Sequence, residues 1–133
     1  MKIDGGCHCG NITFAADIDP GAVVICHCTD CQTLTGSAFR VVLRVPREKV
    51  EWRGGKPKTY IKTAESGNKR AQAFCPECGT PLYAGAVDGT GVVGLRVGTI
   101  KQRDQLKPSK QIWCRSALGW TGDLKSIPQV EKQ

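Results

Sequence analysis

Seven of the eight cysteines in this 133-residue chain lie in three short clusters, and their spacing constrains the fold more than any other feature. The clusters are Cys7-His8-Cys9, Cys26-His27-Cys28-Thr29-Asp30-Cys31 and Cys75-Pro76-Glu77-Cys78-Gly79. Such intervals are typical of metal ligands. A closed zinc site takes four protein ligands, whereas a catalytic zinc site takes three and keeps one position open. Two pairs and one triplet therefore match one closed site and one open site.

The third cluster has the turn chemistry of a zinc knuckle. Pro76 presets a bend, and Gly79 allows a positive φ that lets backbone N–H groups approach the thiolates. One knuckle is half a site, so its partner is either the first pair or part of the triplet. In Cys-x-Cys both side chains point to one face of an extended backbone, so we expect Cys7 and Cys9 to bind one ion from the end of a strand.

The triplet differs from the first pair because its three thiolates lie within six residues and can hold a zinc ion locally. We therefore assign four cysteines to a closed structural zinc site and three to an open catalytic one. The closed set is Cys7, Cys9, Cys75 and Cys78, and the open set is Cys26, Cys28 and Cys31.

The open assignment fails if another protein ligand completes the triplet, and the candidates are His27, Cys114 and Asp30. His27, like His8, lies between two ligands, so we expect its ring to point away from the metal. Cys114 follows an apolar, strand-like stretch, so we expect a small buried side chain, with a ligand or a reactive thiol as the alternative.

A zinc ion with a free position can bind a substrate thiol and hold it as a thiolate at neutral pH. A sulfur-rich site suits thiols better than phosphates. A helical turn over residues 29–34 would also direct backbone N–H groups toward the site and offset its negative charge. Ser37 would place a hydroxyl group near the metal, although its simplest interpretation is a turn residue.

Length and composition fit a single zinc-binding domain over residues 1–133. The chain is long enough for a modest core, and its 16 glycines with few aromatic residues indicate many turns. No apolar run approaches the roughly 18–20 residues that span a bilayer, and the first residues do not form the apolar segment of a signal peptide. We therefore expect a cytoplasmic, reducing location, where cysteines bind metal rather than form disulfides.

The formal net charge of +7 favours an anionic partner. Basic residues are scattered between positions 40 and 70 without a compact run, and no series of aromatic residues accompanies them. A small anion therefore fits better than nucleic acid, and nothing in the sequence indicates a membrane partner.

Hydrophobic alternation predicts an all-β fold. In residues 38–45 it places Phe39, Val41, Leu43 and Val45 on one face and Arg40, Val42 and Arg44 on the other. Further strands are expected at residues 11–16, 23–25, 71–74 and 92–97. Gly54-Gly55 predicts a hairpin between residues 50–52 and 59–61. The one expected helical turn covers residues 29–34, with Thr29 as N-cap and Gly36 just beyond its end.

These motifs resemble those of the glutathione-dependent formaldehyde-activating family. The matching residues are Gly6-Cys7-His8-Cys9-Gly10, Ile12, Phe14, Cys26-His27-Cys28-Thr29-Asp30-Cys31, Gly36-Ser37, Arg70, Phe74-Cys75-Pro76-Glu77-Cys78-Gly79 and Trp120. The resemblance implies a core from about residue 5 to about residue 120 with a short C-terminal tail. It also implies an Mss4-like fold of packed antiparallel sheets and the division of zinc ligands given above.

Family members are carbon–sulfur lyases that join formaldehyde and glutathione into S-hydroxymethylglutathione. We therefore expect a zinc-dependent lyase acting on an anionic thiol, either glutathione or its adduct, with Arg40, Arg44 and Arg70 attracting the carboxylates. The family's usual histidine near the C-terminus is absent from the stretch Gln111-Ile112-Trp113-Cys114.

Two other classes of function also fit the sequence. A zinc-stabilised module would bind nucleic acid or protein through its basic face, and binding to nucleic acid would weaken steeply with salt. A thiol redox enzyme would use Cys114 as its nucleophile.

Overall fold

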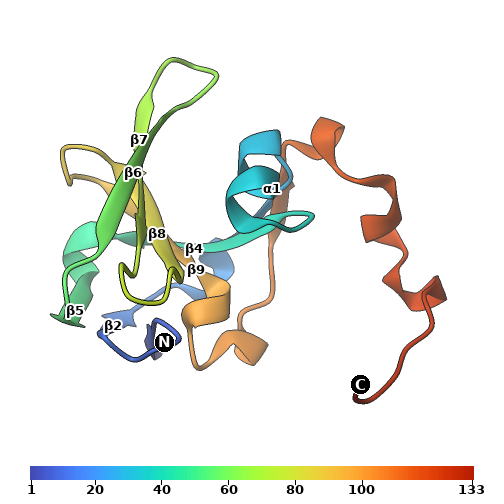
Figure 1. Ribbon diagram of the computed structural model, residues 1–133, viewed down its shortest axis with the longest axis horizontal. Coiled ribbons are helices and arrows are strands. Elements are labelled where there is room, and N and C mark those ends of the chain that lie inside the picture. Colours follow the sequence, from blue (N-terminus) through green and yellow to red (C-terminus); the bar gives the residue numbers. More distant parts are fainter.

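The computed structural model describes residues 1–133, and its strands form two sheets with one short helix (Figure 1). The smaller sheet has the order β1-β2-β5, with β1 at Lys2–Gly6, β2 at Ile12–Asp17 and β5 at Val50–Gly54. The larger has the order β10-β3-β4-β9-β8-β7-β6. Its strands are β3 Val23–Cys26, β4 Arg40–Pro46, β6 Lys58–Thr63, β7 Lys69–Phe74, β8 Pro81–Ala86, β9 Val92–Arg96 and β10 Lys110–Ile112. Helix α1 covers Thr29–Thr35. The prediction of an all-β, Mss4-like fold is confirmed.

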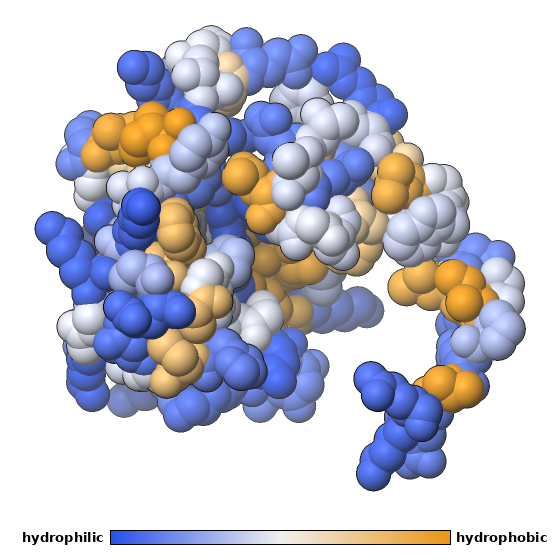
Figure 2. Space-filling model, in the orientation of Figure 1, coloured by the Kyte–Doolittle hydropathy of each residue, from blue (hydrophilic) through white to orange (hydrophobic).

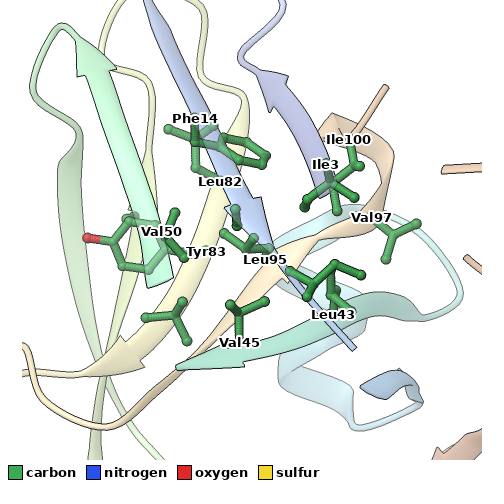
Figure 3. Packing of buried hydrophobic residues seen from close by; sticks show 14 of the residues in the cluster. Ile3, Phe14, Leu43, Val45, Val50, Leu82, Tyr83, Leu95, Val97 and Ile100 are labelled. Carbon is green, nitrogen blue, oxygen red and sulfur yellow. The ribbon is translucent and has the colours of Figure 1, made fainter. Parts of the chain in front are cut away.

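The hydrophobic core lies where the two sheets meet (Figure 3). Leu43, Leu82 and Leu95 of the larger sheet are completely buried. From the smaller sheet, the Phe14 ring lies 5.2 Å from the ring of Trp52, which lies 5.0 Å from that of Tyr83 on β8. Each leucine stabilises the fold by roughly 1.5–3 kcal/mol relative to an exposed position.

The alternation predicted for residues 38–45 is visible in β4. Leu43 and Val45 are buried in the core, whereas Arg44 on the opposite face is exposed. Arg40 lies on the same face as Arg44 and yet is only 6% exposed. The outer face of the larger sheet is therefore covered at one end, and this end contains the cavity described below.

The predicted hairpin around Gly54-Gly55 is wrong, because β5 pairs with β2 and β6 pairs with β7. The chain passes here from one sheet to the other. Gly54 has a φ of +87°, and a Cβ atom on it would lie 2.1 Å from the carbonyl oxygen of Asn11. The glycines therefore permit a close approach of two backbones, and the Gly55 N–H donates to that same oxygen at 2.9 Å.

Strand β10 is parallel to β3, whereas the other strand pairs are antiparallel. Its register places Ile112 opposite Cys26. The parallel pair therefore brings the segment after β10 to the end of β3, beside the second cysteine cluster.

Residues 114–133 leave the body of the molecule as an arm, drawn in red in Figure 1. Its elements are three 3-10 helices, η5 at Cys114–Ser116, η6 at Gly119–Gly122 and η7 at Leu124–Ser126. Backbone hydrogen bonds beyond residue 116 join only neighbouring turns of the arm. Figure 2 shows apolar patches along it. The exposed apolar side chains of the arm include Leu124 at 52% exposure and Ile127 at 48%. None of the helices has the length and apolar character that crossing a membrane requires.

Candidate metal centres

The first and third cysteine clusters meet in space. The sulfur atoms of Cys7, Cys9, Cys75 and Cys78 all lie within 4.8 Å of one another. The Sγ of Cys9 is 3.6 Å from that of Cys7 and 3.8 Å from that of Cys75. A tetrahedral zinc ion with bonds of about 2.3 Å separates its sulfur ligands by about 3.8 Å. Donor type, number and spacing therefore fit one closed zinc site.

Both halves of this four-cysteine cluster are knuckles. Gly79 has a φ of +75°, as the sequence predicted, and donates its N–H to the Cys75 carbonyl at 2.8 Å. Gly10 repeats the arrangement, with a φ of +80° and a hydrogen bond to the Cys7 carbonyl at 3.1 Å. The extended backbone expected for the first pair is therefore wrong. Strand β1 ends at Gly6, and a turn follows.

Thr80 joins the two knuckles. Its hydroxyl oxygen accepts a hydrogen bond from the His8 N–H at 3.0 Å, which leaves the hydroxyl proton free to donate to the Cys78 sulfur at 3.1 Å. That hydrogen bond, with backbone donors, lowers the pKa of Cys78 to about 5. The Ile12 N–H also donates to the Cys7 sulfur at 3.2 Å. These donors favour thiolates, the form that binds metal.

The second cluster gathers Cys26, at the end of β3, with Cys28 and Cys31 around the start of α1. The predicted N-cap, Thr29, is wrong by one residue. The cap is Cys28, whose sulfur accepts a hydrogen bond from the Cys31 N–H at 3.3 Å. Gly36 ends the helix in the left-handed conformation, as expected.

The three thiols of this cluster share their protons unequally. The hydrogen bond between Cys26 and Cys31 lowers the pKa of Cys26 and raises that of Cys31, which burial raises further. Of these two thiols, Cys26 is therefore the one that more readily becomes a thiolate. Three sulfur donors within 4.8 Å of one another also fit a zinc ion.

None of the three candidates for a fourth ligand joins this cluster. The His27 ring is buried against Phe39, and its Nε2 lies 2.7 Å from Oε1 of Gln111. Asp30 accepts from Lys62 at 3.0 Å. Cys114, expected to be buried, is exposed at the first position of η5 because the chain turns away from the sheet there. His8, between the other two ligands, is exposed. The second cluster therefore contains three cysteine ligands and no fourth protein ligand.

The three-cysteine cluster lies in the wall of a cavity of about 940 Å³ on the outer face of the larger sheet. The floor is hollow because Ala84, Ala86 and Gly94 occupy positions where larger side chains would fill it. The only acidic lining residue is Glu65. The basic lining residues are Arg40, Arg44, Lys62, Arg70, Arg96 and Lys110. This cationic cavity therefore suits an anionic ligand.

All three arginines named from the sequence, Arg40, Arg44 and Arg70, line the cationic cavity. Arg96 and Gln72 also line it, and neither was expected there from the sequence. Alternation within β9 places Arg96 on this face, but only the pairing of β4 with β9 brings it near Arg40. Ser37 is exposed beyond α1 and does not line the cavity.

Trp113 lies at the rim of the cationic cavity and is the only residue other than glycine with a positive φ, at +56°. The Arg115 guanidinium lies 4.9 Å from the centre of its ring and 3.5 Å from the carboxylate of Glu65. The rim thus joins the segment after β10 to the loop between β6 and β7.

A second cavity of about 930 Å³ lies beside Cys7, His8 and Phe39, and no residue of the three-cysteine cluster lines it. Arg40 and Arg96 line both cavities and so lie between them. The cationic cavity is the one that combines sulfur ligands with positive charge.

A family model described as "Glutathione-dependent formaldehyde-activating enzyme" matches residues 2–116. No curated protein matches the chain significantly. Among solved structures, a crystal structure of a Rhodobacter sphaeroides protein is similar, with a TM-score of 0.60 and 15% sequence identity. The similarity covers 81% of this chain and 98% of that one. At such low identity, it supports the fold alone.

Proposed function

The chain belongs to the glutathione-dependent formaldehyde-activating enzyme family, and from this we propose that it is a zinc-dependent carbon–sulfur lyase acting on glutathione or a glutathione adduct. The observation that carries the proposal is the position of three cysteines, without a fourth protein ligand, in the wall of a cationic cavity. This combination suits a thiol that bears negative charge.

Two zinc ions per chain follow from the two cysteine sets. The four-cysteine cluster would hold a structural ion, and Cys26, Cys28 and Cys31 would hold the catalytic one. When bound there, zinc supplies a Lewis-acid position at which a substrate sulfur is a thiolate at neutral pH. Because the proposal uses seven of the eight cysteines as zinc ligands rather than in disulfides, it also includes a location in the reducing cytoplasm.

The protein's own part in the reaction is to bind and orient the thiol. Basic side chains of the cavity attract the carboxylates of glutathione and raise its local concentration. In the synthetic direction the thiolate sulfur forms a bond with the formaldehyde carbon, and the proton released by the thiol ends on the former carbonyl oxygen. Cleavage of the carbon–sulfur bond reverses these transfers, and neither direction needs an oxidant or a reductant.

Cobalt substitution tests the proposal, because tetrahedral cobalt–thiolate sites absorb visible light. We expect a spectrum of two such sites, one of which changes when glutathione is added. In Cys28→Ser the responsive site and the lyase activity should disappear while the four-cysteine site remains. Retained activity in Cys28→Ser would refute the mechanism.

The matched control is Cys114→Ser, since Cys114 is exposed and outside both clusters. It should keep both cobalt sites and full activity. Loss of activity with both sites intact would instead favour the redox function, and tight, salt-sensitive binding of nucleic acid without lyase activity would favour a binding module.

A further inference from the structure

Two arginines at the floor of the cationic cavity are buried without an acidic partner. Arg40 is 6% exposed and Arg96 is 8% exposed. Neither takes part in any of the ion pairs of the structure. A buried charge is costly unless it is paired and hydrogen-bonded.

Strand register places these arginines beside the three-cysteine cluster. Arg40 of β4 is the direct partner of Cys26 on β3. Arg96 of β9 is the partner of Val42, two residues further along β4 on the same face. Directly paired residues lie about 5 Å apart at Cβ, so Arg40 is the neighbour of Cys26 and Arg96 follows across β4 on the same face of the sheet.

Hydrogen bonding in the structure leaves this arginine pair with unused donors. Oε1 of Gln72 accepts from Nη1 of Arg40 at 3.1 Å and from Nη2 of Arg96 at 2.8 Å. Nη1 of Arg96 donates weakly to the Gly94 carbonyl at 3.4 Å. The Nε atoms of both arginines are buried and have no partner. Nη2 of Arg40 also has no hydrogen-bond partner and, unlike the Nε atoms, is not fully buried, so a carboxylate oxygen of a ligand can reach it.

We propose that Arg40, Arg96 and Gln72 form a carboxylate subsite for the thiol substrate. The sulfur would lie at the three-cysteine cluster while a carboxylate of the same molecule lies on the arginine pair. The inference rests on the proposed function for the position of the sulfur. It adds a substrate class: thiols and thiol adducts that carry a carboxylate, in preference to neutral thiols of similar acidity.

A competing explanation is that the arginines only offset the negative charge of zinc with three thiolates. That role needs positive charge near the sulfurs but no hydrogen-bond acceptor on the ligand. It therefore predicts equal affinity for charged and neutral thiols, which separates the two explanations.

The first test titrates the cobalt-loaded protein with 3-mercaptopropionate and with 2-mercaptoethanol. These small thiols differ mainly in the carboxylate. We expect 3-mercaptopropionate to bind at least about tenfold more tightly, a factor that corresponds to about 1.4 kcal/mol. Equal affinities would overturn the carboxylate subsite and leave the proposed lyase intact.

Gln72→Glu supplies the arginine pair with an internal carboxylate at nearly unchanged size. We expect this variant to load cobalt normally and to bind the two thiols within threefold of each other. The matched control is Lys58→Gln, which changes the net charge equally on an exposed part of β6 outside the cavity. It should keep the tenfold preference. An unchanged preference in Gln72→Glu would overturn the subsite.

S-Methylglutathione tests the subsite apart from the metal, because its sulfur is blocked. Calorimetry should detect binding to the wild-type protein and at least tenfold weaker binding to Gln72→Glu. This result, combined with a cobalt spectrum insensitive to every thiol, would reject the lyase mechanism and keep the anion site. No binding to the wild type would count against the subsite itself.

Discussion

Thr80 shows how much one hydroxyl group can contribute to a metal site. It accepts from His8 in one knuckle and donates to Cys78 in the other. Thr80→Val keeps the shape of the side chain and removes both hydrogen bonds. Because groups that hydrogen-bond to metal ligands typically contribute 10- to 100-fold in affinity, we expect metal binding at the four-cysteine site to weaken about tenfold.

Competition with a chelator measures this change in affinity. Thr121→Val is the control, since the Thr121 hydroxyl donates to the Leu118 carbonyl within the arm, away from the cysteines. Equal metal release from wild-type protein and Thr80→Val would show that backbone donors alone maintain the site.

We expect the buried charge of Arg96 to lower the free energy of unfolding while it strengthens ligand binding. Loss of hydration on burial lowers the pKa of Arg96 to about 9, which means that the fold disfavours its charged form. Arg96→Met keeps an unbranched chain of similar length without the charge. We expect the free energy of unfolding at neutral pH to rise by about 1 kcal/mol, while binding of 3-mercaptopropionate falls at least tenfold.

Urea unfolding measures the change in the free energy of unfolding, with Arg53→Met as the control. Arg53 is an exposed residue paired with Glu51, so its replacement should change stability by less than about 0.5 kcal/mol. A clear loss of stability in Arg96→Met would mean that the arginine pair serves the fold rather than a ligand.

The grouping of the cysteines was predictable from the sequence, whereas the surroundings of their neighbours were not. Cysteine intervals are set by local chain geometry, so the clusters could be recognised without a structure. Burial of Arg40 and exposure of Cys114 depend on what crosses above each side chain, and alternation along one strand contains no such information. Arg96 and Gln72 join Arg40 only through pairing between distant strands.

Among the structural elements, the link from β5 to β6, which begins at Gly54, allows the most specific prediction. Gly54 and Gly67 both have a φ near +88°, at +87° and +88°. Alanine at Gly67 would meet nothing within 4 Å, whereas at Gly54 it would collide with the Asn11 carbonyl. We expect Gly67→Ala to cost about 1 kcal/mol from backbone strain and Gly54→Ala about 3 kcal/mol from strain plus collision.

Thermal or urea unfolding measures the loss of stability in each variant. The difference between the two losses is the contribution of the close approach between the backbones at Gly54 and Asn11. Equal losses would show that the chain shifts freely at Asn11 and that only the positive φ matters.

The same link explains why the predicted hairpin was wrong. Two glycines between two apolar segments favour a turn, but the signal is equally strong for a close backbone approach. Which sheet a strand joins is decided by its partners, and here β5 pairs with β2, far back in the chain, while β6 pairs with β7, the strand that follows it. By contrast, α1 was predicted within one residue at each end, since its caps are local.

For the molecule as a whole, the arm makes the most direct prediction. Deleting residues 118–133 removes side chains that are largely exposed and backbone bonds that are local to the arm. We expect the melting temperature to change by less than about 2 °C and both cobalt sites to remain. Calorimetry and absorption spectra of the shortened protein measure these quantities.

A longer deletion, of residues 110–133, is the control because it also removes β10 and Trp113. It should disturb the three-cysteine site, beside which β10 pairs with β3. If the shorter deletion already lowers the melting temperature by several degrees, the arm packs against the body or against a second copy in solution.

The class of fold was accessible from the sequence because alternation, glycine content and cysteine spacing all favour a small β domain with metal sites. The division into two sheets was not, since it depends on pairs such as β2 with β5 and β4 with β9 that are far apart in the chain. The parallel pairing of β10 has no sequence signal of its own.

The two cysteine clusters also differ in when they can exist during synthesis. The cysteines of the three-cysteine cluster are all synthesised once the chain reaches Cys31, whereas those of the four-cysteine cluster are complete only at Cys78, 47 residues later. At about 5–20 residues per second, this interval lasts roughly 2–9 seconds. Under the proposed function, the ligands of the catalytic ion are therefore all synthesised before those of the structural ion that would join the two sheets.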